Sequence, residues 1–400
     1  MVSFNLDHHR NPEVLIQDFN SSVRILTLNR PRHFNALSGK MLSQLLRLFL
    51  AHDHDVKVKV VILKSNGEVF SVGGDIVEIA RHLYNGDLRH GLKTTEEAYK
   101  LLYLIATYSK PQVSILNGIA MGRGAAIYLP SRFRIATENS LFSMPETALG
   151  AVPETGASYF LSRLPGFLGE YLALTGARLD GPEMLACGLA THFVPATKLA
   201  LLEQELIASI GALTNERTSS CDLVFYVSSI IHKYSIQPAL KERGSAWHNM
   251  DVIEKCFSKR TVEEVVSALE KEATYTDGHV NGANPWLTST IQSLKKASPI
   301  SLKISLRSIR EGRSQGLGEC LVREYRMVYR IATGEISTDF REGCTALLVD
   351  KDRIQKWEPC KLELVSDQMV DRYFSKLDEV EELKELQLPA RSNLPAIAKL

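Results

Sequence analysis

The sequence has few cysteines for its length, and they form no pattern. The six cysteines among 400 residues are widely spaced and include no C-x-x-C pair. This spacing excludes a disulfide-rich secreted scaffold, which needs cysteines at short, regular intervals. We therefore expect free thiols in a reducing compartment or an organelle matrix.

The sequence also lacks an excess of charge of either sign. Lys and Arg number 47 against 46 Asp and Glu, so no overall field attracts nucleic acid or an anionic membrane. No hydrophobic run reaches the length of a membrane span, and the first residues lack a secretory core or an arginine-rich transit pattern. We expect a protein that is not secreted and that binds any charged ligand through local groups.

What the sequence does contain is an alternation of β-rich and helical segments in its first half. The β-rich runs cover residues 14–19, 23–30, 58–65, 111–118 and 133–137. Helical spacing of apolar residues covers 38–55, with Ser38 as N-cap, and 95–109. From about residue 200 the segments read as helices, among them 198–213, 261–273, 301–312 and 371–386. This order predicts a layered α/β core with a mostly helical second half.

Two glycine-rich segments follow β-rich runs and lead into helical ones. They are "FSVGGDIVEIA" (70–80) and "NGIAMGRGAA" (117–126), and Arg123 interrupts the small residues of the second. A glycine turn before a helix exposes backbone N–H groups, and two such turns could direct two N–H groups at one carbonyl oxygen. The alternative for each turn alone is a structural glycine.

A third segment, "SMPETALGAVPETGASYF" (143–160), carries two glutamates that each follow a proline. Glu146 and Glu154 could supply an acid and a base from one loop. The alternative is a pair of solvated loop carboxylates.

In this order the three segments resemble the crotonase, or enoyl-CoA hydratase/isomerase, superfamily. Longer stretches, including "LFSMPETALGAVPETGASYFLSRLPG" and "LALTGARLDGPEMLACGLATHFVP", resemble its 3-hydroxyisobutyryl-CoA hydrolase branch, and the plant peroxisomal form most. The resemblance implies an α/β fold of repeated ββα units around a spiral of two stacked sheets. It places a catalytic core in residues 1–200 and a mostly helical extension that covers the site in 201–400.

The resemblance also implies roles for individual residues. It puts a thioester oxygen between the backbone N–H groups of Gly74 and Arg123, makes Glu146 the catalytic carboxylate, and makes Glu154 a second acid that meets the substrate hydroxyl or handles a proton. CoA would lie along the backbone of two segments. The positions implied for CoA are Asn35, Ala36, Leu37, Asp75 and Ile76, with Arg30, Arg32 and His33 as candidates for its phosphates or, alternatively, as a solvated loop.

Three departures from the hydrolase pattern fall in the expected substrate site. Arg123 replaces the middle glycine of G-G-G, Glu154 replaces an aspartate, and Ala98 replaces a glutamate, with Glu97 one place away. One helical position is a rotation of about 100°, so Glu97 is poorly placed to substitute. We expect Arg123 to fill part of the acyl pocket, or to pair with Glu146 or Glu154 and lower that carboxylate's pKa, and to add strain if its φ is positive.

The implied activity is hydrolysis of 3-hydroxyisobutyryl-CoA in valine catabolism, weakened by these departures and without a metal or redox cofactor. Glu146 could act as a base on water or as a nucleophile. Hydration is disfavoured because Ala126 stands where hydratases of the superfamily have a second glutamate. Two alternatives are an enoyl-CoA isomerase and a family member that keeps the fold without turnover.

The chain ends in Ala398-Lys399-Leu400, a relaxed form of the S-K-L peroxisomal signal. We expect a peroxisomal protein whose accessible tail binds the import receptor. An acyl-CoA substrate is the other expected partner, a homo-oligomer is left open, and neither nucleic acid nor a membrane is expected.

Overall fold

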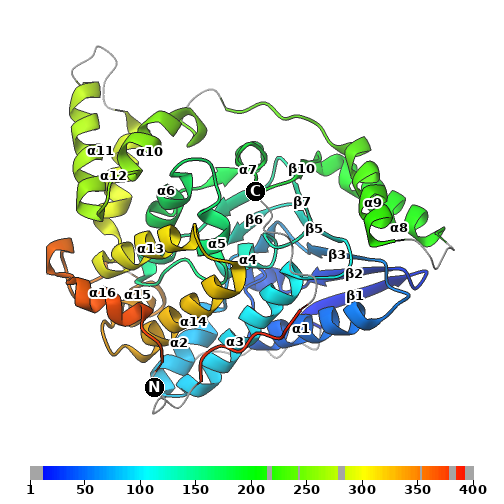
Figure 1. Cartoon of the computed structure of the whole chain (residues 1–400), viewed down its shortest axis with the longest axis horizontal. Coiled ribbons are helices and arrows are strands. Elements are labelled where there is room, and N and C mark those ends of the chain that lie inside the picture. The colour runs from blue at the N-terminus through cyan, green and yellow to red at the C-terminus, as the bar shows by residue number, and fades with distance from the viewer. Residues whose placement is uncertain are drawn as a thin grey trace.

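The computed structural model describes residues 12–213, 219–241, 244–277, 284–351, 354–377 and 384–391, and it has an α/β architecture (Figure 1). The strands all lie in the first half of the chain. They are β1 (Val14–Phe19), β2 (Val23–Leu28), β3 (Val60–Ser65), β4 (Val69–Ser71), β5 (Gln112–Leu116), β6 (Ile119–Met121), β7 (Phe133–Ala136), β8 (Leu141–Ser143), β9 (Leu179–Asp180) and β10 (His192–Phe193).

The strands form two sheets that share a repeated pattern. A six-stranded sheet has the order β1-β2-β3-β5-β7-β10, and a four-stranded sheet has the order β4-β6-β8-β9. The pairs β3/β4, β5/β6 and β7/β8 each place their first strand in the larger sheet and their second in the smaller one. The helices of this half are α1 (Gly39–His54), α2 (Ile76–Asn85), α3 (Leu88–Ala106), α4 (Arg123–Ala126), α5 (Ala157–Leu161), α6 (Leu168–Thr175) and α7 (Gly181–Cys187).

β1 and β2 confirm the first two β-rich runs predicted from the sequence, and α1 confirms the helix predicted over 38–55. β1 pairs antiparallel with β2, and the turn between them holds Asn20 and Ser21 at positive φ, 51° and 57°. Such left-handed turn residues match the twist of a two-stranded ribbon. The Oγ of Ser38 accepts a hydrogen bond from the Met41 N–H and so caps α1.

The six-stranded sheet is buried on both faces, as its alternating side chains show. In β3, Val60 and Ile62 pack with the helices α8 (Leu199–Gly211) and α9 (Ser220–Tyr234), whereas Val61 and Leu63 belong to the main core. Period-two alternation sends successive strand residues to opposite faces. A division of the chain between residues 200 and 201 therefore falls within a helix that packs on the sheet.

The remaining helices lie on the other side of the molecule from α8 and α9 (Figure 1). They are α10 (Met250–Phe257), α11 (Val262–Asp277), α12 (Pro285–Lys296), α13 (Pro299–Gly312), α14 (Leu317–Thr333), α15 (Asp339–Leu348) and α16 (Asp367–Phe374). The helices predicted over 198–213, 261–273 and 301–312 are confirmed as α8, α11 and α13. In the described part of the chain, no helix combines the length and the apolar character needed to cross a membrane.

The helix predicted over 371–386 is confirmed only as far as Phe374. Residues 375–377 and 384–386 are not helical, and 378–383 lie outside the described residues. α16 ends at Phe374, and Ser375 has an extended backbone with ψ 151°. The Glu385 carboxylate accepts a hydrogen bond of 3.0 Å from the Leu377 N–H and binds the Arg326 guanidinium at 2.8 Å. A tertiary ion pair thus holds Glu385 in a stretch that is not helical.

Candidate functional site

Three neighbouring parallel strands end at the same edge of the smaller sheet. β6 pairs in parallel with β4 on one side and with β8 on the other. Because parallel strands share a direction, the segments that follow them meet at one edge. These segments begin with Gly73-Gly74, Gly122-Arg123 and Pro145-Glu146, so the topology gathers the three sequence motifs.

The first two turns approach each other through their backbones. Gly73 has φ +109°, and a Cβ built on it would lie 3.1 Å from the Met121 carbonyl oxygen and 3.6 Å from the Arg123 nitrogen. Among the described residues, neither the Gly74 N–H nor the Arg123 N–H donates a hydrogen bond. Two adjacent, unused N–H donors suit an oxygen that gains negative charge.

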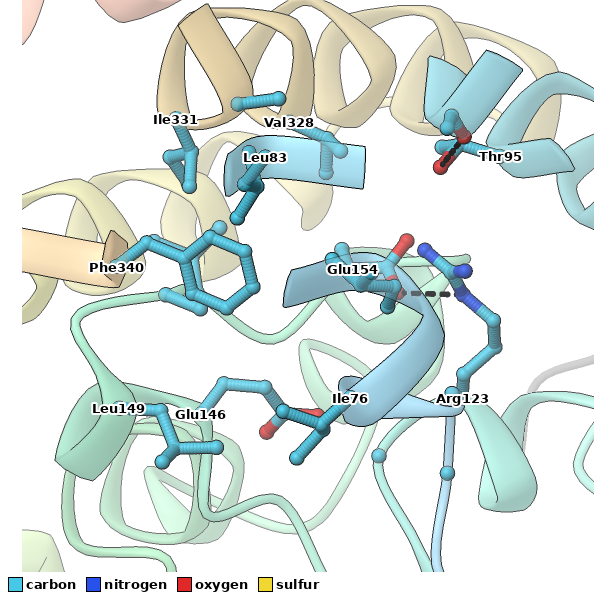
Figure 2. A pocket seen from close by; sticks show the side chains of 18 of the residues that line it. Ile76, Leu83, Thr95, Arg123, Glu146, Leu149, Glu154, Val328, Ile331 and Phe340 are labelled. Carbon is cyan, nitrogen blue, oxygen red and sulfur yellow. Dashed lines mark hydrogen bonds and ion pairs between the residues drawn. The ribbon is translucent and has the colours of Figure 1, made fainter. Parts of the chain in front are cut away.

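These donors border a cavity of about 190 Å³ (Figure 2). Arg123, Glu146 and Glu154 bring polar atoms to it. Much of its lining is apolar, including Ile76, Ile79 and Leu83 from α2, Val328 and Ile331 from α14, and Phe340 from α15. Helices α14 and α15 of the second half therefore form one wall of the site.

Glu146 is the first residue of a short 3-10 helix, Glu146–Leu149, and its carboxylate reaches the second turn. A Cβ on Gly122, which has φ +49°, would lie only 2.6 Å from Glu146 Oε1, so glycine is needed there. Within the described residues the buried Oε2 has no hydrogen-bond partner. Burial raises the pKa of Glu146 to about 8, the nearby Glu154 adds to the rise, and Arg123 opposes it.

The Arg123 side chain lies inside the site and pairs with Glu154. Its Nε donates to Glu154 Oε1 at 3.1 Å, and the two side chains are 9% and 12% exposed. Burial lowers the pKa of Arg123, but the Glu154 carboxylate outweighs this and raises it, so the guanidinium stays charged. Arg123 Nη1 lies 3.6 Å from the position of a Cβ on Gly74.

The condition for backbone strain at Arg123 is not met. The positive φ of this turn belongs to Gly122, and Arg123 begins α4 without a left-handed backbone, so the arginine adds no such strain. Arg123 pairs with Glu154 and not with Glu146, whose pKa burial raises against the opposing influence of Arg123. The expectation that the guanidinium enters the pocket and pairs with a carboxylate is confirmed.

Glu97 and Ala98 do not line the cavity, contrary to expectation. Glu97 Oε2 accepts a hydrogen bond from the Ser43 hydroxyl on α1, and Ala98 is buried in the hydrophobic core. The physical reason is that α3 begins at Leu88, before the predicted start at 95, and its earlier turns reach the cavity. The residues of α3 that line it are Gly91, Leu92 and Thr95.

The segments predicted to receive CoA are joined to each other. The Leu37 N–H donates to the Gly73 carbonyl at 2.8 Å, and the Asp75 N–H donates to the Leu37 carbonyl at 3.1 Å. The buried Asn35 amide donates to two backbone carbonyls at 2.8 and 2.7 Å. Arg30 binds Asp75 at 3.0 Å and also the Ala36 carbonyl.

These hydrogen bonds show that several of the side chains at the positions predicted to bind CoA have a structural role. The side chains of Asn35, Arg30 and Asp75 hold the loop of residues 30–37 against the start of α2. CoA would therefore contact the backbone groups of this loop and not these side chains. Ile76 lines the cavity. Arg32 and His33 are exposed on the 3-10 helix Pro31–His33.

The sequence reading missed the cavity wall contributed by α14 and α15. Val328, Ile331 and Phe340 belong to amphipathic helices, and an apolar helical position carries no signal that tells a cavity wall from a core. It also missed the buried carboxylate of Glu324 on α14. Across the described ranges, no group of three or more His, Cys, Asp or Glu side chains could hold a metal ion.

Comparisons with known proteins agree with this geometry. A family model described as enoyl-CoA hydratase/isomerase matches residues 23–374. "3-hydroxyisobutyryl-CoA hydrolase 1" of Arabidopsis thaliana is 57% identical over 390 residues, covering 97% of this chain and 98% of that protein. "3-hydroxyisobutyryl-CoA hydrolase, mitochondrial" of Gallus gallus is 37% identical, covering 91% and 89%.

A solved structure has the same fold. The crystal structure of a carnitinyl-CoA dehydratase from Mycobacterium thermoresistibile superposes with a TM-score of 0.80 at 29% identity, covering 94% of this chain and 99% of that one. The expected crotonase-type fold of repeated ββα units is thereby confirmed. The chain belongs to the enoyl-CoA hydratase/isomerase family.

Proposed function

We propose that this protein hydrolyses the thioester of 3-hydroxyisobutyryl-CoA, giving 3-hydroxyisobutyrate and CoA in valine catabolism. The observation that carries the proposal is the buried Glu146 carboxylate beside two unused backbone N–H donors. Relatives of up to 57% identity that carry the name of this hydrolase support the same substrate.

The two donors would act on the thioester carbonyl. Attack on this carbon moves negative charge to its oxygen, and the N–H groups of Gly74 and Arg123 would bind that oxygen more tightly in the transition state. Each such donor is worth on the order of 3 kcal/mol. Arginine in place of glycine leaves this contribution intact, because the donor belongs to the backbone.

Glu146 has two routes open to it. As a base it would take a proton from the attacking water, and as a nucleophile it would form an anhydride that water then opens. Both routes require the ionised carboxylate. Glu154 would meet the substrate hydroxyl or handle a proton, a role that its ion pair with Arg123 restrains.

The raised pKa of Glu146 predicts how activity depends on pH. With a pKa of about 8, about a tenth of the free protein carries ionised Glu146 at pH 7. The kcat/KM for thiol release should therefore rise from pH 6 through pH 8 and level off above about pH 9. A flat profile between pH 6 and 9 would rule out Glu146 as the titrating base.

Stability should change in the opposite direction over the same range. The folded pKa of Glu146 lies above the ordinary value of 4.5, so the folded state favours the protonated form. The stability linked to this group is complete below about pH 4.5 and is lost as pH rises through about 8. Glu146→Gln should thus gain stability relative to the unaltered protein at pH 9, as thermal unfolding would measure.

CoA would enter as part of the substrate and follow the backbone of Asn35–Leu37 and of Asp75-Ile76. Arg32 and His33 are the exposed candidates for the CoA phosphates. The proposed reaction uses no metal or redox cofactor, because N–H donors and a carboxylate supply the required chemistry.

We also propose peroxisomal import through Ala398-Lys399-Leu400, which lies outside the described residues. A fluorescent fusion with a free C-terminus should collect in peroxisomes, and deletion of these three residues should leave it in the cytosol. The deletion spares Arg391, which binds Asp53 at 2.6 Å and is the last described residue, so the melting temperature should not change. Import that persists after the deletion would show that the signal lies elsewhere.

The proposed activity is tested by following free thiol over a panel of acyl-CoAs. Incubation with 3-hydroxyisobutyryl-CoA should release CoA and 3-hydroxyisobutyrate at a low rate that depends on Glu146. An enoyl-CoA whose double bond moves without release of thiol would instead indicate an isomerase. A protein that binds CoA and converts no member of the panel would have lost turnover.

A further inference from the structure

A buried carboxylate from the second half of the chain lies behind Glu154. Glu324 on α14 is fully buried, and its Oε2 accepts a hydrogen bond of 2.5 Å from the Gly156 N–H. Its Oε1 accepts one of 2.8 Å from the Ser158 N–H and another from the Ser158 hydroxyl. One side chain thus binds three donors of the segment that directly follows Glu154.

This segment has an unfavourable backbone. Thr155 has φ +55° and Gly156 has φ +87°. A β-branched residue in the left-handed region is a strained outlier, with a cost on the order of 1–3 kcal/mol, and it persists only where its surroundings hold it. Thr155 is 1% exposed, and its hydroxyl donates to Glu154 Oε2. The strained turn therefore determines where the Glu154 carboxylate lies.

The support for this turn continues behind Glu324. Arg323 Nη2 donates to the Ser158 hydroxyl and to the Ser308 carbonyl, each at 2.8 Å. Arg323 thereby links α14 both to α13 and to Ser158, whose own hydroxyl donates to Glu324. Burial raises the pKa of Glu324 to about 7, and its hydrogen bonds with Ser158 and Gly156 oppose the rise. Because this hydrogen-bond network is buried, the loss of one of its partners would leave a buried polar group unpaired and would destabilise the folded protein.

We propose that Glu324 is a positioning residue for the active site: its carboxylate holds the Thr155-Gly156 turn in the strained shape that directs Glu154 toward Arg123 and the cavity. Figure 2 shows Glu154 beside Arg123 at the cavity. The hydrogen bonds of the Glu324 carboxylate go to Gly156 and Ser158, in the segment that directly follows Glu154. The catalytic consequence rests on the proposed hydrolase function, whereas the effect on the turn does not.

The test is Glu324→Gln, with Glu170→Gln as the matched control. Glutamine keeps the volume of Glu324 but turns an acceptor into an NH₂ donor that faces another N–H group. Glu170 is equally buried and binds Arg313 at 2.8 Å, away from the turn. Amide hydrogen exchange in residues 154–158 should quicken about tenfold or more in Glu324→Gln and stay unchanged in Glu170→Gln.

Thiol release from 3-hydroxyisobutyryl-CoA gives the second measurement. Glu324→Gln should lower kcat about tenfold with KM within about twofold, because CoA binding does not use the turn. If Glu324→Gln does not fold, Ser158→Ala removes one of the three donors and should lower kcat about threefold at unchanged KM. A folded Glu324→Gln protein with a protected turn, or Ser158→Ala with unchanged kcat, would overturn the proposal. Absence of thiol release by the unaltered protein would contradict the hydrolase function alone, since exchange still tests the turn.

Discussion

Glu146→Gln should lower thiol release from 3-hydroxyisobutyryl-CoA by about a hundredfold or more. Glutamine keeps the shape of the side chain, including the close approach of its terminal atoms to Gly122. It cannot take a proton from water and cannot form an anhydride, so both routes proposed for Glu146 are lost. Initial rates at about pH 9, where about nine-tenths of Glu146 is ionised in the unaltered protein, measure the effect most clearly.

The control for this variant is CoA binding. The segments Asn35–Leu37 and Asp75-Ile76 do not depend on the charge of Glu146, so the affinity for CoA, measured by calorimetry, should stay the same. Equal hydrolysis by the variant and the unaltered protein would remove Glu146 from the mechanism.

Arg123→Gly should raise the same rate by at least about tenfold. The guanidinium lies over Gly74, with Nη1 3.6 Å from its Cβ position, and so fills space beside one of the two N–H donors. Glycine empties this space and releases Glu154, while the backbone N–H of residue 123 is retained. The unaltered protein should accordingly be a weak hydrolase.

Arg123→Met separates the bulk of the side chain from its charge. Methionine keeps an unbranched chain out to the position of Nε and carries no charge, so it should release Glu154 while emptying less of the pocket than glycine does, and it should give a smaller gain. If methionine raised the rate of thiol release as much as glycine does, the ion pair between Arg123 and Glu154, and not the bulk of the side chain, would be what limits the rate. Full activity of the unaltered protein, with a loss on Arg123→Gly, would mean that Arg123 binds the substrate.

The sequence predicted the long elements well because their signals are local. The hairpin of β1 and β2 has its turn residues between two apolar runs, and α1 has both its apolar period and its cap at Ser38. The residue pattern did not show the strands of the second sheet, which only the family resemblance implied, because β4, β6 and β8 have three residues each and are too short for a period to be read. These strands nevertheless bring the three motifs together.

The other differences between the sequence predictions and the structure arise from side chains that bind partners far away in the sequence. The guanidinium of Arg123 had two carboxylates within reach, and only the folded chain selects Glu154. Glu385 lies in a run with helical character, yet it binds Arg326 from a stretch, residues 384–391, that is not helical. Glu324 looks like an ordinary helical glutamate, and its role depends on a turn that lies 168 residues away along the chain.

The crystal structure of the Glu146→Gln protein with 3-hydroxyisobutyryl-CoA tests the central claim most directly, since this variant should bind the thioester without cleaving it. We predict that the carbonyl oxygen lies about 2.7–3.1 Å from both the Gly74 nitrogen and the Arg123 nitrogen, with the thioester carbon facing residue 146. A thioester bound with its carbonyl oxygen away from these two N–H groups would contradict the account.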